Sequence, residues 1–283
     1  MEQKKDLSLV NCIATSLLAY FITVPGHELL HLLTHMIYGD KLLYYSACAV
    51  DAVVTDYSSM PLFHRIMDAG ASACILNAIF GIILVIVLLK KKMGPMLRVF
   101  LIQLMGAQIS QGFGYFMIGG FFGVGDWGNV FNVLTDQPGL VTVFRITLSI
   151  IGSAGIVALF FILNHMSYYF IKDSENKKER MHVAARLHLP MFIIGVVVGT
   201  VVWAMSPVVK SGELSFGIGL FFDLMWVPFF WGFMFTGVMK TLPPKESRFL
   251  YPLPAEPHHF LLAAGIVLIL VDIFVFGPGI FFS

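Results

Sequence analysis

Seven long apolar segments dominate this sequence and leave few folds open to it. An α-helix needs about 20 mostly apolar residues to cross the hydrocarbon core of a bilayer. Seven stretches of the 283-residue chain reach that length, at residues 8–38, 69–89, 97–122, 139–171, 187–206, 214–239 and 259–282. Because backbone polar groups in lipid must be satisfied within the segment, such stretches predict helices. We expect an all-α polytopic membrane protein with about seven transmembrane helices.

The composition argues against both a soluble domain and a nucleic-acid-binding protein. Hydrophobic residues make up 58% of the chain and charged residues only 12%, whereas a soluble domain carries about 25% charged residues. The net charge of +1 gives no basic surface for nucleic acid. The three cysteines, Cys12, Cys48 and Cys74, lack the spacing of a metal knuckle and are interpreted as buried thiols. The lipid bilayer is the expected partner of the apolar surface.

The basic residues predict how the chain is inserted. Cytoplasmic loops of membrane proteins carry an excess of Lys and Arg. With the N-terminus inside, 14 of the 18 basic residues fall at or near the inside ends of the seven segments. The pattern therefore predicts a cytoplasmic N-terminus and an external C-terminus.

The connection between the first two segments is too polar to cross the membrane. It reads "DKLLYYSACAVDAVVTDYSSMPLFHR", residues 40–65. Its β-branched and tyrosine residues predict a short hairpin or a re-entrant strand pair.

The first apolar segment contains ionisable residues, which are costly in a bilayer and mark functional sites. In "FITVPGHELLHLLTHMIYG", residues 21–39, His27, Glu28 and His31 form the pattern His-Glu-x-x-His. Residues four apart lie on one face of a helix, so His27 and His31 can bind one metal ion, with Glu28 placed to accept a proton from water. Zinc lowers the pKa of a water ligand towards about 7. The motif predicts a hydrolytic zinc site; the alternative is a polar patch satisfied by neighbouring helices.

A third ligand is needed, because catalytic zinc usually has three protein ligands. The segments at 8–38 and 97–122 run in the same direction, so their C-terminal ends lie at the same depth. Asp126 follows the second of them in "GDWGNVFNVLTDQPG", residues 125–139. It is either the third ligand or the N-cap of a helix starting at Trp127, and spacing alone leaves the two open.

Other polar residues within the apolar segments compete for that role. His35 shares the face of His27 but lies about 12 Å further along the axis, too far to share one ion. Asp223 and Asp272 lie in the middle of apolar segments. They could be ligands, members of a proton relay or partners of Arg145.

Together these residues resemble the site-2-protease family of intramembrane zinc metalloproteases, as a divergent member. "GHELLHLLTHMIYG" resembles the Gly-His-Glu-x-x-His helix of that family. "DAGASACILNAIFGIIL", residues 68–84, resembles its Ala-Gly-Pro stretch with a downstream Asn, although Ala71 replaces the proline and Asn77 is displaced. The segment around Asp126 resembles the one that supplies the last ligand in divergent members; the Asn-Pro…Leu-Asp-Gly form is absent.

The resemblance covers residues 12–140 and implies a metalloprotease-like core of three helices at 1–140, followed by additional helices of unknown role at 141–283. It implies that His27, His31 and Asp126 bind Zn²⁺ and that Glu28 is the general base. The implied reaction is hydrolysis of a peptide bond in or near a transmembrane segment of another membrane protein, in a bacterial cell membrane. The bacterial relatives act nearer the cytosol, whereas the charge pattern places this site near the outer face.

Two further elements could contact a substrate. Asn77 and Gln108 could line the cavity or donate to the oxyanion, or they could form ordinary interhelical hydrogen bonds. The polar residues 44–59 could hold a substrate as an added strand, or form a plain surface hairpin.

Two other classes of function stay open. A non-proteolytic zinc-binding membrane protein, either a transporter or a scaffold, is the first; Glu28 argues against the scaffold, and Asp223 and Asp272 favour the transporter. The second is a membrane di-iron hydroxylase, with the three histidines at 27, 31 and 35 joined by the pair at 258–259. That chemistry needs about eight histidines, and the sequence has no second box of the required kind.

Overall fold

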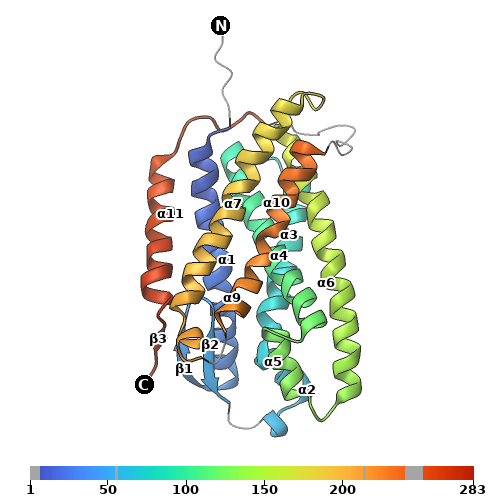
Figure 1. The fold of residues 1–283 in the computed structure, drawn as a ribbon, viewed down its shortest axis with the longest axis vertical. Coiled ribbons are helices and arrows are strands. Elements are labelled where there is room, and N and C mark those ends of the chain that lie inside the picture. The colour runs from blue at the N-terminus through green and yellow to red at the C-terminus, as the bar shows by residue number, and fades with distance from the viewer. Residues whose placement is uncertain (1–6, 55–56, 213–214, 240–250) are drawn as a thin grey trace.

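The computed structural model of the chain describes residues 7–54, 57–212, 215–239 and 251–283. Long helices run side by side in an up-and-down bundle, with a small sheet at one end (Figure 1). The long helices are α1 (Leu9–Tyr38), α3 (Ser72–Lys90), α4 (Pro95–Phe122), α6 (Pro138–Ser167), α7 (Lys177–Met205) and α11 (His259–Val271). The shorter helices are α2 (Leu62–Ile66), α5 (Asp126–Val133), α8 (Pro207–Lys210), α9 (Phe216–Phe222) and α10 (Val227–Phe233).

Several turns of different pitch extend these helices. Segments of π-helix lie at Met67–Ala71, Met234–Val238 and Asp272–Phe276, and 3-10 turns lie at Tyr57–Ser59, Tyr168–Phe170 and Asp223–Trp226. The first of these segments contains a kink at Gly70, whose φ of +145° is non-helical, so α2 and α3 are two helices that meet at a kink within residues 62–90.

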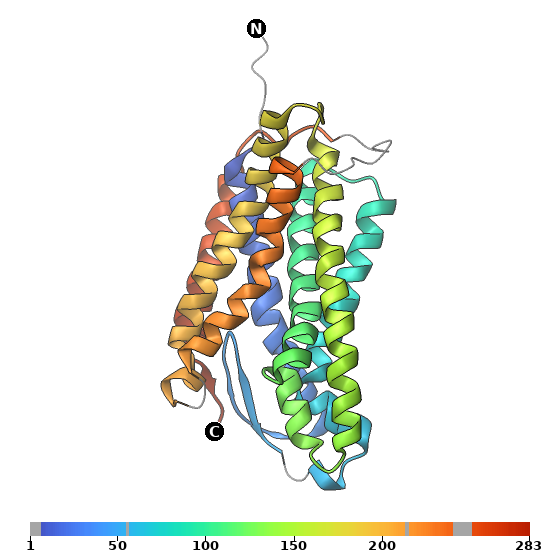
Figure 2. The same ribbon diagram turned by 45° about the vertical axis from the view of Figure 1, so that its right-hand side comes forward.

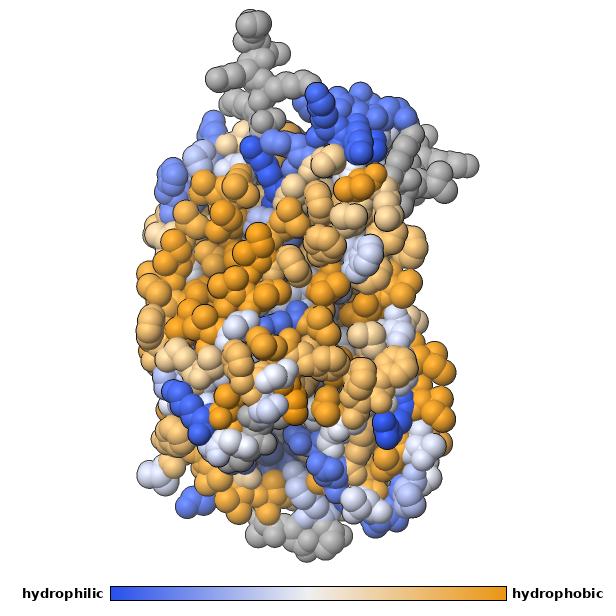
Figure 3. All heavy atoms as spheres, viewed as in Figure 1, coloured by the Kyte–Doolittle hydropathy of each residue, from blue (hydrophilic) through white to orange (hydrophobic). Residues whose placement is uncertain are grey.

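Six helical segments of the described chain are long and apolar enough to cross a membrane, at Leu9–Tyr38, Leu62–Lys90, Pro138–Phe170, Lys177–Met205, Phe216–Val238 and His259–Phe276. The surface shows the same property, with a broad apolar band between more hydrophilic ends (Figure 3). The protein is therefore an all-α polytopic membrane protein, as predicted.

Helix α4 is the predicted span that is absent from those six. It packs against α1, α3 and α6, and it buries polar residues that lower its hydropathy. Neighbouring segments bind two of these groups: Ser110 donates to the Met225 carbonyl at 2.7 Å, and Gln108 donates to Thr23 at 3.2 Å. A helix surrounded by protein needs no lipid-compatible surface, so α4 is long and central yet comparatively polar.

The ends of three helices differ from the sequence prediction. Helix α7 begins at Lys177, ten residues before the predicted residue 187, because Asn176 caps it by accepting from the backbone N–H of Lys178 and Glu179. The second predicted segment begins earlier as well, at Leu62. At the other end of the chain, the helical part of residues 259–282 stops at Phe276, and Ile280–Phe281 form strand β3.

The predicted hairpin is present and gains a third strand. Strands β1 (Lys41–Tyr45) and β2 (Val50–Val53) pair antiparallel, and β3 pairs with the other edge of β1 to give the order β2-β1-β3. The hairpin stands at the lower end of the bundle between α9 and α5 (Figure 2). The Tyr45 hydroxyl donates to the Pro25 carbonyl at 2.9 Å, which fixes the sheet to α1 beside the His-Glu-x-x-His motif.

The direction of the helices bears on the depth of the motif. Helices α1 and α4 both run from the top to the bottom of Figure 1, and the hairpin, α5 and β3 lie at the bottom. The basic stretches at residues 90–98 and 172–186 lie at the opposite end of the bundle from the hairpin, α5 and β3. Lys4, Lys5 and the basic residues at 240–248, which also enter the charge prediction, lie outside the described residues.

Candidate metal centre

The two histidines of the motif come together on the inner face of α1. Ser8 caps the start of the helix by accepting from the Asn11 backbone N–H, and Gly39 caps its end in a left-handed conformation. His27 and His31 are buried, and their Nε2 atoms lie 3.2 Å apart. The four-residue spacing therefore directs one nitrogen of each ring to the same point, as the sequence predicts.

Asp126 reaches the same point from α5. Gly125, whose φ is +66°, turns the chain just before α5 begins, a conformation that favours glycine. The Asp126 side chain makes no capping hydrogen bond to α5. Instead its Oδ2 lies 2.9 Å from His27 Nε2 and 3.2 Å from His31 Nε2. The structure thus places Asp126 in contact with both histidines, and its role as a metal ligand stays a prediction.

The three atoms have the spacing of a tetrahedral zinc site. Ligands about 2.0–2.1 Å from a tetrahedral zinc lie roughly 3.3 Å from one another. The observed separations among His27 Nε2, His31 Nε2 and Asp126 Oδ2 are 2.9, 3.2 and 3.2 Å. Burial alone would raise the pKa of Asp126, but His31 and His27 outweigh it and hold the pKa well below its ordinary value. The carboxylate is therefore anionic, the form that binds a metal.

Neighbouring residues fix the orientation of the His27 ring. The Asn77 amide lies 3.0 Å from His27 Nδ1, and Tyr115 stacks on the ring with the centroids 4.8 Å apart and the planes 6° from parallel. Rotation of the amide by half a turn places its oxygen where it accepts the Nδ1 proton, which leaves the Nε2 lone pair for a metal. Asn77 is thus suited to positioning a metal ligand.

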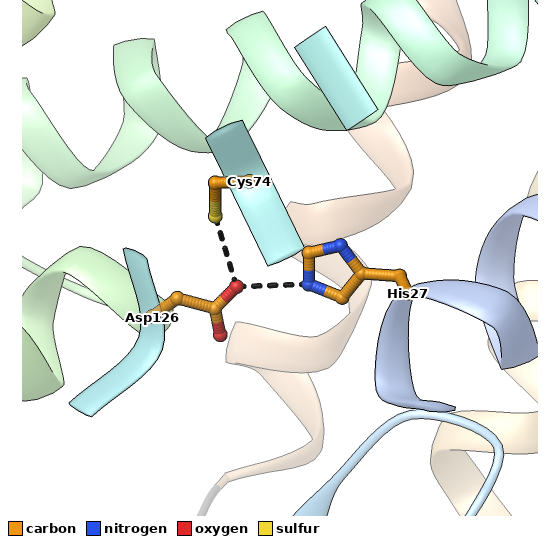
Figure 4. Close-up of side chains that lie close together, drawn as sticks. All are labelled: His27, Cys74 and Asp126. Atoms are coloured by element: carbon orange, nitrogen blue, oxygen red, sulfur yellow. Dashed lines mark hydrogen bonds and ion pairs between the residues drawn. The ribbon is translucent and has the colours of Figure 1, made fainter. Parts of the chain in front are cut away.

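Cys74 is a further member of the centre, and the sequence analysis interprets it only as a buried thiol. Its thiol donates to Asp126 Oδ2 at 3.1 Å. Figure 4 shows the Asp126 carboxylate between the Cys74 sulfur and the His27 ring. Ligand atoms of His27, Cys74 and Asp126 lie within 4.8 Å of one another. A lone Cys without a metal-binding spacing gave no signal of this in the sequence.

A cavity of about 540 Å³ opens onto the centre. Glu28, His31 and Asp126 line it, together with residues 50–52 of β2 and with Trp203 and Phe222. Glu28 also lines a small cavity of about 30 Å³ beside His27. The base predicted from the motif therefore borders space that a substrate and a water molecule can occupy.

The two residues predicted to contact substrate do not line the 540 Å³ cavity. Asn77 contacts His27, and Gln108 donates to Thr23 on α1. Neither is among the residues that line the 540 Å³ cavity. Their part in substrate binding stays a prediction, and the contacts described here are interhelical.

The other polar residues singled out in the sequence have different hydrogen-bond partners from the three candidate ligands, although Asp223 borders the small cavity beside His27. Asp223 accepts a hydrogen bond from Thr200 at 2.9 Å, and Arg145 donates to the backbone carbonyls of Gly120 and Phe121. Among the residues that the structure describes, no hydrogen-bond partner faces either oxygen of Asp272.

The histidines of the di-iron alternative do not gather in one place. The His258 backbone N–H donates to the Asn11 side chain at 2.8 Å. Asn11 precedes His27 by 16 residues in α1, about 24 Å along the helix axis. The pair at 258–259 therefore lies at the opposite end of the bundle from His27 and His31.

A scan against protein-family models gives no match, and neither the curated proteins nor the solved structures contain a significant one.

Gly70 allows α5 to approach the second membrane segment, and its replacement gives a first prediction. A Cβ atom at Gly70 would lie 2.7 Å from the Asp126 carbonyl oxygen and 2.8 Å from its Cβ, and the φ of Gly70 is +145°. We expect Gly70→Ala to lower the free energy of unfolding by about 2 kcal/mol and to weaken zinc binding, because Asp126 must shift. Thermal unfolding and zinc titration measure the two effects.

Gly26→Ala is the matched control, since a Cβ there meets no atom within 4 Å. It should leave both stability and zinc affinity at wild-type values. If Gly70→Ala has the same free energy of unfolding and the same zinc affinity as Gly26→Ala, the close contact between Gly70 and Asp126 is contradicted.

Proposed function

We propose that this protein is an intramembrane zinc metalloprotease of the site-2-protease type, which hydrolyses a peptide bond in or near a transmembrane segment of a membrane-protein substrate. One observation carries the proposal: three ligand atoms from His27, His31 and Asp126 lie 2.9–3.2 Å apart, and Glu28 follows the first ligand and lines the adjoining cavity. Structural zinc sites usually have four protein ligands, whereas catalytic sites keep one position open.

The residues fit the ion by number, atom type and environment. Two imidazole nitrogens and one carboxylate oxygen form a common ligand set for catalytic zinc. Asn77 supports His27 through Nδ1, as outer hydrogen bonds do in metal sites. A zinc ion bound there would supply a Lewis acid that makes water nucleophilic at neutral pH.

The chain itself would contribute the proton transfer and the holding of the substrate. Glu28 would accept the proton of the attacking water and pass it to the leaving amine. The helices around the buried centre would limit access of bulk water. Strand β2 is at the edge of the sheet and lines the cavity, so an unwound substrate could pair with it as an added strand.

The setting belongs to the proposal as well. The basic residues favour a cytoplasmic N-terminus, which would put the centre near the outer face. The resemblance favours a bacterial cell membrane.

A zinc-binding membrane protein without proteolytic activity, above all a transporter, is the second candidate. Asp223 is buried and borders the 30 Å³ cavity that Glu28 also lines. Buried carboxylates in membrane helices are typical of ion and proton pathways.

Reconstitution with substrate tests the proposal directly. The purified protein is incorporated into liposomes with a panel of tagged single-span membrane proteins, and the fragments are mapped by mass spectrometry. We expect cuts in or near the spans that appear with zinc and disappear when a chelator removes it. Zinc movement across the same liposomes without any cleavage would favour the transporter.

A further inference from the structure

A second cluster of metal-binding residue types lies one helical turn beyond the candidate zinc centre. His35 follows His31 by four residues in α1. Its Nδ1 lies 2.9 Å from Asp40 Oδ2 and 3.1 Å from Asp68 Oδ1. The three ligand atoms lie within 4.8 Å of one another. His35 and Asp68 line the same 540 Å³ cavity as the first centre, so an ion has a route to both clusters.

Two pieces of chain form this cluster. After Gly39 ends α1, the Asp40 backbone N–H donates to the His35 carbonyl at 3.0 Å, which brings the Asp40 side chain back to the ring. Asp68 comes from the segment Met67–Ala71, where the non-helical Gly70 kinks the chain between α2 and α3. The arrangement therefore depends on two local departures from regular helix.

The charges of the cluster are unbalanced. Both carboxylates are buried, with side chains 1% exposed at Asp40 and 0% at Asp68. The His35 hydrogen bond goes to Asp40. Asp68 shares the same ring nitrogen at 3.1 Å, and Asp40 and the Tyr57 hydroxyl lie beside its carboxylate. One imidazole carries at most a single positive charge, so with both carboxylates ionised the buried cluster keeps an excess negative charge, which is unfavourable.

We propose that His35, Asp40 and Asp68 form a second site for a divalent cation, independent of the proposed protease centre. A cation among the three atoms would contact both carboxylates and the ring nitrogen at once. Adjacent ligands about 2.1 Å from an ion lie roughly 3.0 to 3.3 Å apart, close to the observed 2.9 and 3.1 Å. One nitrogen with two carboxylate oxygens favours a first-row ion such as Zn²⁺.

An ion at this site would join the elements that frame the cavity. It would link the end of α1 and the residue after Gly39 to the kinked segment Met67–Ala71. That segment also contains Gly70, which lies against Asp126. The second site would therefore hold one wall of the cavity without contacting the ligands of the first centre.

Zinc content of purified full-length variants tests the inference. We expect about two molar equivalents of Zn²⁺ in the wild type, about one in Asp68→Asn, His35→Gln or His31→Ala, and close to none in His31→Ala/Asp68→Asn. Added Zn²⁺ should raise the melting temperature of His31→Ala but not that of the double variant. Asp136→Asn is the matched control: this carboxylate pairs with Arg65 at 2.8 Å on the same end of the bundle, and its loss should leave two equivalents.

The outcomes separate the two sites. Wild-type zinc content in both Asp68→Asn and His35→Gln would overturn the second site and leave the protease proposal intact. Loss of one equivalent in Asp68→Asn, with none lost in His31→Ala, would support the second site and overturn the first.

Discussion

Replacing Glu28 with glutamine is expected to leave zinc bound and to reduce peptide hydrolysis by about 10²–10⁴-fold, the usual contribution of a general base. Glutamine keeps the shape of the side chain but cannot accept the proton of the attacking water. His27, His31 and Asp126 are unchanged, so the three ligand atoms keep their positions. Initial rates on a cleaved reporter, together with zinc content, measure both halves of the prediction.

Glu256→Gln is a suitable control for that variant. Glu256 is exposed, and its backbone carbonyl accepts from Asn11 at the far end of α1, so its replacement should leave the rate at the wild-type value. Full activity in Glu28→Gln would exclude Glu28 as the general base of the reaction.

Removal of a first-centre ligand should abolish both zinc binding at that centre and turnover. His31→Ala and Asp126→Ala each take away one of three atoms that lie within 3.2 Å of one another. Two remaining ligands cannot hold zinc at a catalytic site that normally uses three. We expect each variant to lose about one molar equivalent of zinc and to cleave no faster than background.

Cys74→Ser provides the contrast. The serine hydroxyl can still donate to Asp126 Oδ2, the acceptor that lies 3.1 Å from the native sulfur. Zinc content should stay at the wild-type level, and affinity should change by about tenfold at most. If Cys74→Ser loses zinc as completely as His31→Ala, Cys74 is a fourth ligand. The centre is then closed, and hydrolysis there is untenable.

Much of the candidate centre could be predicted because its key features are local. The four-residue spacing of His27 and His31 places them on one face of the helix. Glu28 lies close to the candidate ligands because it directly follows His27. The prediction that Asp126 lies near the histidines also required that α1 and α4 run in the same direction. The structure brings Asp126 within 3.2 Å of both histidines.

Other features gave no signal in the sequence. The sequence around Cys74 does not indicate that its thiol donates to Asp126. The sequence around Asp68 likewise does not indicate that its carboxylate lies beside His35. Strand β3 pairs with β1 although more than 200 residues separate them. The hydropathy of α4 also does not show that it is buried among other helices, where Gln108 and Ser110 find hydrogen-bond partners.

The sequence by itself determined the membrane class, the approximate positions of the helices, the hairpin and the His-Glu-x-x-His face, because each depends on periodicity and composition within a short stretch. Only the tertiary structure decided which side chains meet across helices: Asp126 and Cys74 at the first centre, and Asp40 and Asp68 around His35. Those contacts depend on distortions such as the kink within Met67–Ala71 and the close approach at Gly70. Such distortions result from packing between distant segments, which leaves no pattern in the local sequence.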